Sequence, residues 1–225
     1  MRVVDCEYLK DNSISVLEFK GEAQHGISIH YDSLWRIRDS SFFRHGKKNG
    51  DLVFFDSLAN EIGRVHYKNG IRVGKETLFY SPGLPELVKH YNKDGKEDGP
   101  WLEWWPNGNK RKELELSHGQ LRTSLEFFPN GKPRLKYSVH FKKVSPILYD
   151  RKVSAMETWA PDGRPAGKVE MGNGEVLLFQ LDEDKVIPEV IRETYRDSLV
   201  KDVNVLDTLQ AYRRLDSLKR IHSGK

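Results

Sequence analysis

The sequence predicts a mainly β protein, in which tandem β-hairpin repeats form an elongated single-layer sheet and an α-helical segment ends the chain. Three observations predict this class. An aromatic residue recurs about every two dozen residues, glycines recur at fixed distances from it, and a glycine-free apolar pattern follows the last repeat. Stacked hairpins are stable because each one covers the apolar face of the next.

The aromatic series sets the length of the repeat. Its members follow one another at a nearly constant interval of about two dozen residues, at Tyr31, Phe55, Phe79, Trp104 and Phe128. Glycine lies five residues before the first four of them, at Gly26, Gly50, Gly74 and Gly99. A second glycine series lies nine residues before the last four, at Gly46, Gly70, Gly95 and Gly119. A fixed period of this length indicates an array of stacked hairpin units.

Turn residues divide each repeat into two strands. Asn69-Gly70 and Asp94-Gly95 favour tight hairpin turns, because these residue types accept positive φ. Pro-Asn-Gly at residues 106–108 and 129–131 predicts a second turn after the aromatic. The segments between the turns, such as residues 101–105, are rich in aromatic side chains, as strands are.

One unit resembles a known family. Residues 91–112, YNKDGKEDGPWLEWWPNGNKRK, are similar to the bacterial variant of the MORN repeat. Residues 64–80 and 117–137 match this pattern less fully, and residues 21–43 keep only part of it. The resemblance covers about residues 21–142 and implies the stacked-hairpin fold. Bacterial members are often described as YwqK-like antitoxins, which implies a protein that sequesters a toxin or effector, while MORN repeats elsewhere are scaffolds for protein or membrane contacts.

Three regions are expected along the chain. Residues 1–20 are predicted to form capping strands, residues 21–181 the repeat array, and residues 182–225 a helical cap. Within the array, residues 143–156 break the period and are predicted to be an insertion, and residues 157–181 to be degenerate units.

The helical prediction comes from apolar residues at helical spacing between Val190 and Ile221, with Pro188 in a first helical turn. These helices have two interpretations. They cover the open edge of the array, or they bind a partner or a second copy.

The composition narrows the class of protein. With 37 basic and 33 acidic residues the net charge is only +4, which does not predict a nucleic-acid partner. Cys6 is the only cysteine, so no intrachain disulfide forms and a reduced, cytoplasmic location is expected. No apolar run is long enough to span a bilayer.

The residues show no catalytic or metal-binding pattern. His66 and His90 stand one repeat length apart and therefore occupy equivalent repeat positions. There is no His-Glu-x-x-His motif and no pair of cysteines for zinc. Asn92, Asp94 and Asp98 are explained as turn formers rather than calcium ligands. We expect a protein that is not an enzyme and holds no metal or cofactor.

Aromatic and basic residues predict a protein-binding surface. Strand alternation places Trp101 and Trp105 on one face and Leu102 and Trp104 on the other. A thin sheet buries both faces only if something covers them, which is either the C-terminal helices or a partner. The predicted partner-binding residues are Phe54, Tyr80, Trp101, Trp105, Phe127, Arg111 and Arg122.

The leading hypothesis is a bacterial antitoxin or immunity protein that neutralises a cognate toxin or effector by direct contact. The alternative is a scaffold or adaptor with a peripheral membrane role, for which the basic C-terminal segment gives weak support. Nucleic-acid binding through aromatic and basic residues is a third hypothesis and is not expected. The sequence leaves the oligomeric state open.

Overall fold

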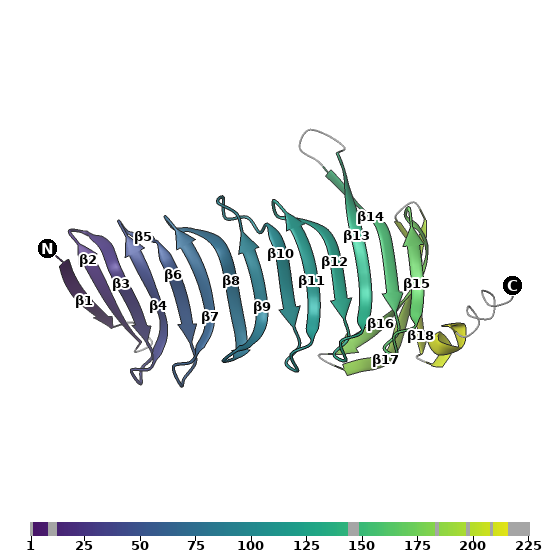
Figure 1. Cartoon of the computed structure of the whole chain (residues 1–225), viewed down its shortest axis with the longest axis horizontal. Helices are drawn as coiled ribbons and strands as arrows, with labels where there is room; N and C mark the ends of the chain where they lie inside the picture. Colours follow the sequence, from purple (N-terminus) through teal and green to yellow (C-terminus); the bar gives the residue numbers. More distant parts are fainter. Residues whose placement is uncertain are drawn as a thin grey trace. The chain divides into compact units, whose positions relative to one another are not determined.

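A computed structural model describes residues 2–8, 13–143, 149–182, 185–196, 199–207 and 209–215. This part of the chain is mainly β. Its 18 strands are antiparallel and follow one another as hairpins, and a single short helix spans residues 209–215 (Figure 1). The predicted class, a mainly β succession of hairpins with a helical segment near its end, is confirmed. The chain divides into two compact units, which are described separately.

Unit 1 comprises residues 1–108 and 116–120. Its strands pair antiparallel in chain order, and β4 pairs with both β5 and β6. Their bounds are β1 (Arg2–Tyr8), β2 (Ile14–Lys20), β3 (Ala23–Tyr31), β4 (Ile37–Arg44), β5 (Lys47–Lys48), β6 (Gly50–Phe55), β7 (Glu61–Lys68), β8 (Ile71–Ser81), β9 (Leu84–Tyr91) and β10 (Gly99–Trp104). The region expected to form capping strands thus contributes the β1–β2 hairpin.

The strand register of unit 1 defines two faces. Residues directly opposite each other on antiparallel strands share a side of the sheet. Leu52, Val65 and Glu76 oppose one another on β6, β7 and β8, and we call their side the Val65 face. Val53 opposes Arg64 on the other side, the Arg64 face. Both Val65 and Val53 are buried, so the core of unit 1 is thin and draws on both faces.

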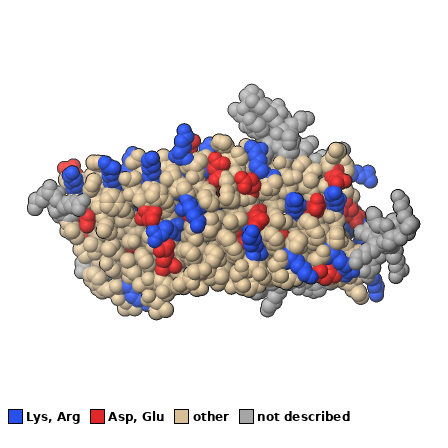
Figure 2. All heavy atoms as spheres, in the orientation of Figure 1, with Lys and Arg blue, Asp and Glu red and all other residues tan. Residues whose placement is uncertain are grey.

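The turns of unit 1 alternate between two edges, because each strand reverses the direction of the one before. At the glycine-turn edge, φ is 52° and 75° at His45 and Gly46, and 52° and 85° at Asn69 and Gly70. Positive φ at both positions is the type I′ geometry, whose twist suits a hairpin. The opposite edge, the tip edge, holds the turns that begin at Asp32, Asp56 and Ser81. Lys and Arg side chains follow the glycine-turn edge in the space-filling view (Figure 2).

Unit 2 comprises residues 109–115 and 121–225. β11 (Lys110–Ser117) has residues in both units. From β12 onward the strands pair antiparallel in chain order. Their bounds are β12 (Gln120–Phe127), β13 (Pro133–Lys143), β14 (Tyr149–Trp159), β15 (Pro165–Glu170), β16 (Asn173–Asp182), β17 (Lys185–Arg196) and β18 (Leu199–Asp207).

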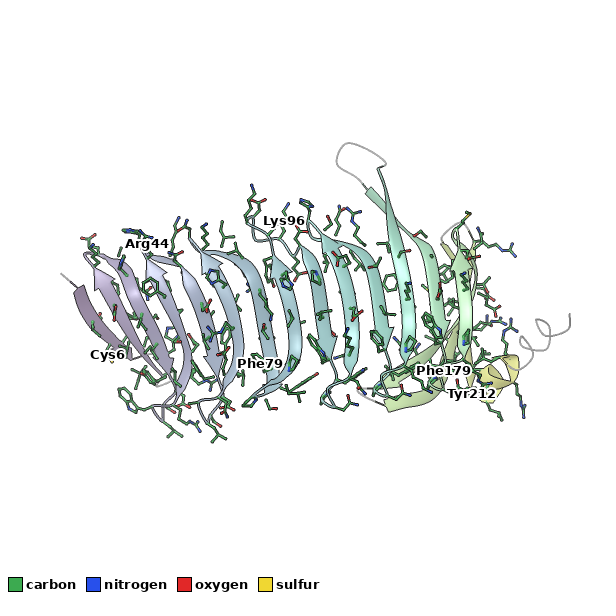
Figure 3. All side chains as sticks on the ribbon, viewed as in Figure 1. Cys6, Arg44, Phe79, Lys96, Phe179 and Tyr212 are labelled. Carbon is green, nitrogen blue, oxygen red and sulfur yellow. The ribbon has the colours of Figure 1, made fainter. Side chains whose placement is uncertain are left out.

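Unit 2 has a thicker core than unit 1. β16 contacts β13 and β14 as well as its hairpin partners, and Arg134 Nε donates a 3.0 Å hydrogen bond to the Phe179 carbonyl oxygen. The short helix adds Ala211 and Leu215, both buried in the same cluster as Phe179. The centre of its Tyr212 ring lies 5.5 Å from that of the Phe179 ring, and both residues are labelled in Figure 3.

The prediction of a helical cap over residues 182–225 is wrong for most of its described part. β17 and β18 occupy much of it, and the described helix is confined to residues 209–215. Val190 and Ile191 suggested helical spacing but are β-branched, as are Val200, Val203 and Val205 in the same stretch, and such residues favour strands. Val190 is buried and lies opposite Leu206 on β18.

Residues 143–156, predicted to be an insertion, continue a hairpin in their described part. β13 runs to Lys143 and β14 starts at Tyr149, and these two residues oppose each other. Residues 144–148 lie outside the described residues. The β13–β14 hairpin is longer than those of the repeat and contains a bulge, so no glycine falls at the expected phase.

Residues 157–181, predicted to be degenerate units, include the end of β14, β15 and most of β16. The turn that begins at Ala160 repeats the hydrogen bonds of the turn that begins at Phe128. Ala160 N–H donates to the Arg164 carbonyl, and Phe128 N–H donates to the Lys132 carbonyl, both at 2.8 Å. The two turns therefore share one geometry although their first residues differ greatly in size.

Candidate functional site

A polar and aromatic cluster lies on the Val65 face of unit 1, over β8, β9 and β10. Tyr91 Oη donates a 2.6 Å hydrogen bond to Glu76 Oε2. Arg72 Nη1 donates to Tyr91 Oη at 3.0 Å and to Glu76 Oε2 at 3.3 Å. Glu76 is only 9% exposed, so its charge is compensated inside the protein by Arg72. We call the whole group the Glu76 cluster: Arg72, Glu76, Lys89, Tyr91, Glu97 and Trp101.

The second half of the Glu76 cluster centres on Lys89. The strand register places Lys89 opposite Glu76, on the same face. Lys89 Nζ lies 3.8 Å from the centre of the Trp101 ring and 3.2 Å from Glu97 Oε1. A cation above an indole ring is attracted by the negative charge of the ring face. The Trp101 ring is therefore engaged with a neighbouring strand.

Within the Glu76 cluster, the surroundings raise the pKa values of Tyr91 and Arg72. Burial is the main cause that raises the pKa of Tyr91 to about 12, the hydrogen bond to Glu76 raises it too, and Arg72 acts in the opposite direction. The hydrogen bond with Tyr91 is the main cause that raises the pKa of Arg72. Tyr91 therefore stays neutral and Arg72 stays charged at ordinary pH.

A cation–aromatic stack recurs with the period of the repeat. Lys48 Nζ lies 5.4 Å from the centre of the Tyr67 ring, and the Arg72 guanidinium lies 5.2 Å from that of Tyr91. The second pair lies one repeat after the first in the sequence. Sequence reasoning did not detect these stacks, because the two residues of each pair belong to different parts of the repeat. The signal is a cation two residues after a turn glycine, followed at a fixed distance by tyrosine.

The predicted partner-binding residues do not behave as one exposed stripe. Four belong to unit 1 and three to unit 2: Phe54, Tyr80, Trp101 and Trp105, and Arg111, Arg122 and Phe127. The two arginines are exposed, whereas Phe54, Tyr80, Trp101 and Phe127 are half-buried. Tyr80 Oη donates a 2.9 Å hydrogen bond to the Trp104 carbonyl oxygen, so its polar end is already used inside unit 1.

Trp105 is a correction to the predicted surface. Its side chain is only 4% exposed, so it does not present a ring to a partner. β10 ends at Trp104 and the chain turns at once, with Gly108 N–H donating to the Trp105 carbonyl at 2.9 Å. Strand alternation therefore stops before Trp105. The equivalent first turn residues Phe128 and Ala160 are buried as well.

The turns at the tip edge of unit 1 are held by aspartates. Asp32 Oδ1 accepts hydrogen bonds from the N–H groups of Leu34 and Arg36, at 2.9 and 3.0 Å. These bonds, led by that from the Arg36 N–H, lower the pKa of Asp32. Asp56, one repeat later, accepts the two equivalent N–H groups at 2.8 and 2.9 Å. Both turns are thus rigidly shaped by an ionised side chain.

Large apolar side chains project from these two turns. Leu34 is 69% exposed, Trp35 57% and Leu58 80%. We call these three residues the apolar tip patch. The two turns stand one repeat apart on the same edge, and two strand spacings correspond to about 10 Å. The patch therefore offers neighbouring apolar side chains on a fixed backbone.

Sequence reasoning recognised the two turns but not the exposure of their apolar residues. Asp-Ser-Leu occurs at residues 32–34 and 56–58, and also at residues 197–199 and 216–218, so the signal is the one-repeat spacing of the first two. Leucine is an unusual choice for the tip of a tight turn, where Gly, Pro, Asn, Asp and Ser predominate.

The described residues provide charged and apolar contacts. Within them, no group of three or more His, Cys, Asp or Glu side chains is arranged to hold a metal ion. Nor does the described part contain a helix that is long and apolar enough to cross a membrane. Asp51 is paired with the Arg64 guanidinium, whose Nη1 lies at 2.5 Å, and contacts His66 Nδ1 at 2.7 Å.

Comparison with known proteins gives no family: no family model matches this chain, and no curated protein matches it. The likeness of residues 91–112 to the bacterial MORN repeat therefore stays a prediction from the sequence.

Proposed function

We propose that this chain is a non-catalytic protein-binding repeat protein that neutralises a cognate toxin or effector by direct contact, as an antitoxin or immunity protein. The observation that carries the proposal is the apolar tip patch. Tryptophan is enriched among the residues that dominate binding energy at protein interfaces. Exposed Leu34, Trp35 and Leu58 on rigid turns fit that role because little conformational entropy is lost when they are buried by a partner.

The backbone of Trp35 supports a role outside the fold. Its φ is 61°, a region in which a bulky residue is strained by about 1–3 kcal/mol. Gly108 and Gly131 occupy the equivalent positions in later turns, where they adopt positive φ without strain. Trp35 packs against Tyr31, with ring centres 5.9 Å apart, yet stays 57% exposed, and contact with a partner would cover that apolar surface.

The antitoxin role itself rests on the resemblance of residues 91–112 to bacterial MORN-type repeats. Neutralisation by contact requires a shaped surface and no reacting group, which agrees with the rigid turns of unit 1. We further propose a cytoplasmic location, with which the single free and exposed cysteine, Cys6, agrees, and a bacterial source, which rests on the resemblance alone.

The test is a pull-down from the native host with a variant that removes the patch and keeps the turns. Trp35→Asn combined with Leu58→Asn is suitable, because asparagine tolerates the left-handed region at position 35. We expect one abundant protein to be recovered with the native chain and lost with the double variant. Met171→Asn is the matched control, since Met171 is also an apolar turn residue with positive φ and is 92% exposed. Recovery of the same protein by the double variant would contradict the proposal.

A scaffold or adaptor with a peripheral membrane role is the second candidate. The same patch favours it, because tryptophan and leucine at turn tips suit the interface of a bilayer. Flotation with phosphatidylserine-containing vesicles separates the two functions. Vesicle binding that disappears in the double variant, without a recovered protein partner, supports this alternative. A partner recovered without vesicle binding supports neutralisation by contact.

A further inference from the structure

The glycine-turn edge of unit 1 carries a regular row of cations. Lys20, Arg44 and Lys68 end β2, β4 and β7, and Lys93 lies in the turn after β9, so the four recur with the period of the repeat. Lys47 and Lys96 follow the turn glycines. All six side chains are exposed, and blue side chains follow this edge in Figure 2. Figure 3 labels Arg44 and Lys96 on it.

These cations are not neutralised by neighbours. In the part of the chain that the structure describes, none of the six forms an ion pair. Glu22 and Asp94 are exposed acids on the same edge, whereas Glu97 is already paired with Lys89. Asp98 accepts hydrogen bonds from the Asn92 side chain and from the His118 N–H. The edge therefore keeps an excess of positive charge.

An open hollow lies between two successive cations of this row, Lys68 and Lys93; we call the repeated positions of the row its rungs. The hollow measures about 460 Å³ and is lined by Lys68, Asn69, Ile71, Val73, Gly74, Tyr91 and Lys93. Lys68 and Lys93 supply positive charge to it, while Ile71 and Val73 make part of its lining apolar. Ile71 is 45% exposed, so an apolar surface is available between the two lysines. A volume of this size accommodates a side chain of a bound peptide.

We propose that the glycine-turn edge binds an extended acidic segment of a partner protein, with carboxylates on the cations and an apolar side chain in the hollow. Successive rungs are two strands apart, which is about 10 Å. Three residues in the polyproline II conformation, which is extended, rise about 9 Å and return the side chain to the same side. A segment with an acidic residue at every third position therefore matches the row. This inference deepens the proposed function, since it depends on the chain having a protein partner.

The edge suits a peptide better than a nucleic acid. B-DNA carries one negative charge per ~1.7 Å of its axis, far denser than rungs ~10 Å apart. Glu22 and Asp94 stand among the cations and repel a continuous polyanion. The apolar wall at Ile71 gains nothing from contact with a charged phosphate backbone, whereas a leucine or isoleucine side chain of a peptide would be buried against it.

The direct test uses a fluorescein-labelled synthetic peptide of about 12 residues, with glutamate at every third position and leucine and glycine between. We expect saturable binding that weakens as salt rises. Lys68→Glu combined with Lys93→Glu should reduce affinity at least about tenfold. Lys75→Glu is the control on the same unit, because Lys75 is exposed on the Arg64 face, whereas Tyr91 of the hollow lies on the Val65 face. The affinity of this control should stay within about twofold of the native value. A peptide of the same composition with its glutamates clustered should bind more weakly.

Three results would overturn the inference. They are equal affinity of the native chain and the double charge reversal, equal binding of the two peptides, and preferential binding of a short DNA duplex or of phosphatidylserine-containing vesicles through the same lysines. Circular dichroism of each variant establishes that it is folded. A recovered protein partner that needs Trp35 but not Lys68 and Lys93 would sink this inference and leave the proposed function standing. Lysine-dependent peptide binding without any recovered partner would support the glycine-turn edge as a peptide-binding surface and would contradict the proposed function.

Discussion

Trp35 and Ala59 hold the same backbone conformation one repeat apart, with φ of 61° and 63°. Their N–H groups donate to the carbonyls of Asp32 and Asp56 at 3.0 and 3.1 Å, which closes each turn in the same way. Side chains are disfavoured at such φ, and glycine takes the equivalent position in later turns. At the residue scale, two turns of unit 1 therefore contain stored strain, and only Trp35 gives a large exposed side chain in return.

Ala59→Gly is predicted to raise the free energy of unfolding by up to about 1 kcal/mol, because relief of backbone strain exceeds the added entropy of the unfolded chain. Urea unfolding measures it. Ala155→Gly, in exposed strand backbone of β14, should instead lower the free energy of unfolding by about 0.5–1 kcal/mol. A loss of stability in Ala59→Gly would show that the turn is not strained.

The burial and exposure of individual side chains were harder to predict from the sequence than the positions of the turns. The spacing of the glycines predicted where hairpins turn, and positive φ at Gly46, Gly70 and Gly95 agrees with it. Burial of Trp105 was not predictable from strand alternation, because the strand ends one residue earlier than the aromatic run suggests. Exposure of Leu58 depends on a side-chain hydrogen bond of Asp56 that fixes the turn, and a repeat pattern does not show such a bond.

At the scale of elements, contacts between adjacent strands organise unit 1. Glu76 on β8 accepts a hydrogen bond from Tyr91 on β9, and Lys89 on β9 covers Trp101 on β10. The Arg72–Tyr91 stack repeats the Lys48–Tyr67 stack one unit later. These contacts join strands of unit 1, where the apolar core is thin.

Tyr91→Phe tests the network on β8 and β9. The loss of one donor to buried Glu76 should lower the free energy of unfolding by about 1–2 kcal/mol near neutral pH. Because folding raises the pKa of Tyr91 from 10.0 to about 12, its contribution is complete below pH 10 and is lost as pH rises toward 12. The difference in the free energy of unfolding between the native chain and Tyr91→Phe should therefore narrow as pH rises from about 9 to 11. Urea unfolding at each pH measures it. A constant difference over this range would contradict the assigned titration.

The secondary structure of the repeat array was predictable from the sequence, whereas that of β17 and β18 was not. Turn chemistry in the array is local, so hairpins followed from the spacing of Gly and Asn. The sequence between β17 and β18 offers Asp197-Ser198 but no glycine, and the apolar residues of the two strands fit a helical period as well as a strand period. Long-range packing decides between them, because Val190 is buried in the core that also holds Phe179 and Ala211.

At the scale of the whole molecule, each unit is stabilised differently. Unit 1 has a thin core, repeated cation–aromatic stacks and two turns with exposed apolar residues. Unit 2 concentrates its buried residues in clusters that include the short helix, and Arg214 of that helix pairs with Glu175 on β16 at 2.6 Å. Both proposed interaction surfaces belong to unit 1, one at its tip edge and one at its glycine-turn edge.

The most direct test of the central claim is a titration of the partner recovered in the pull-down. The toxic activity of that partner would be measured while the chain is added in increasing amounts. Neutralisation by contact predicts a linear loss of activity that ends at about one equivalent and is absent for Trp35→Asn with Leu58→Asn. Complete inactivation by a small fraction of an equivalent would contradict the account, because it would show turnover. So would full neutralisation by the double variant.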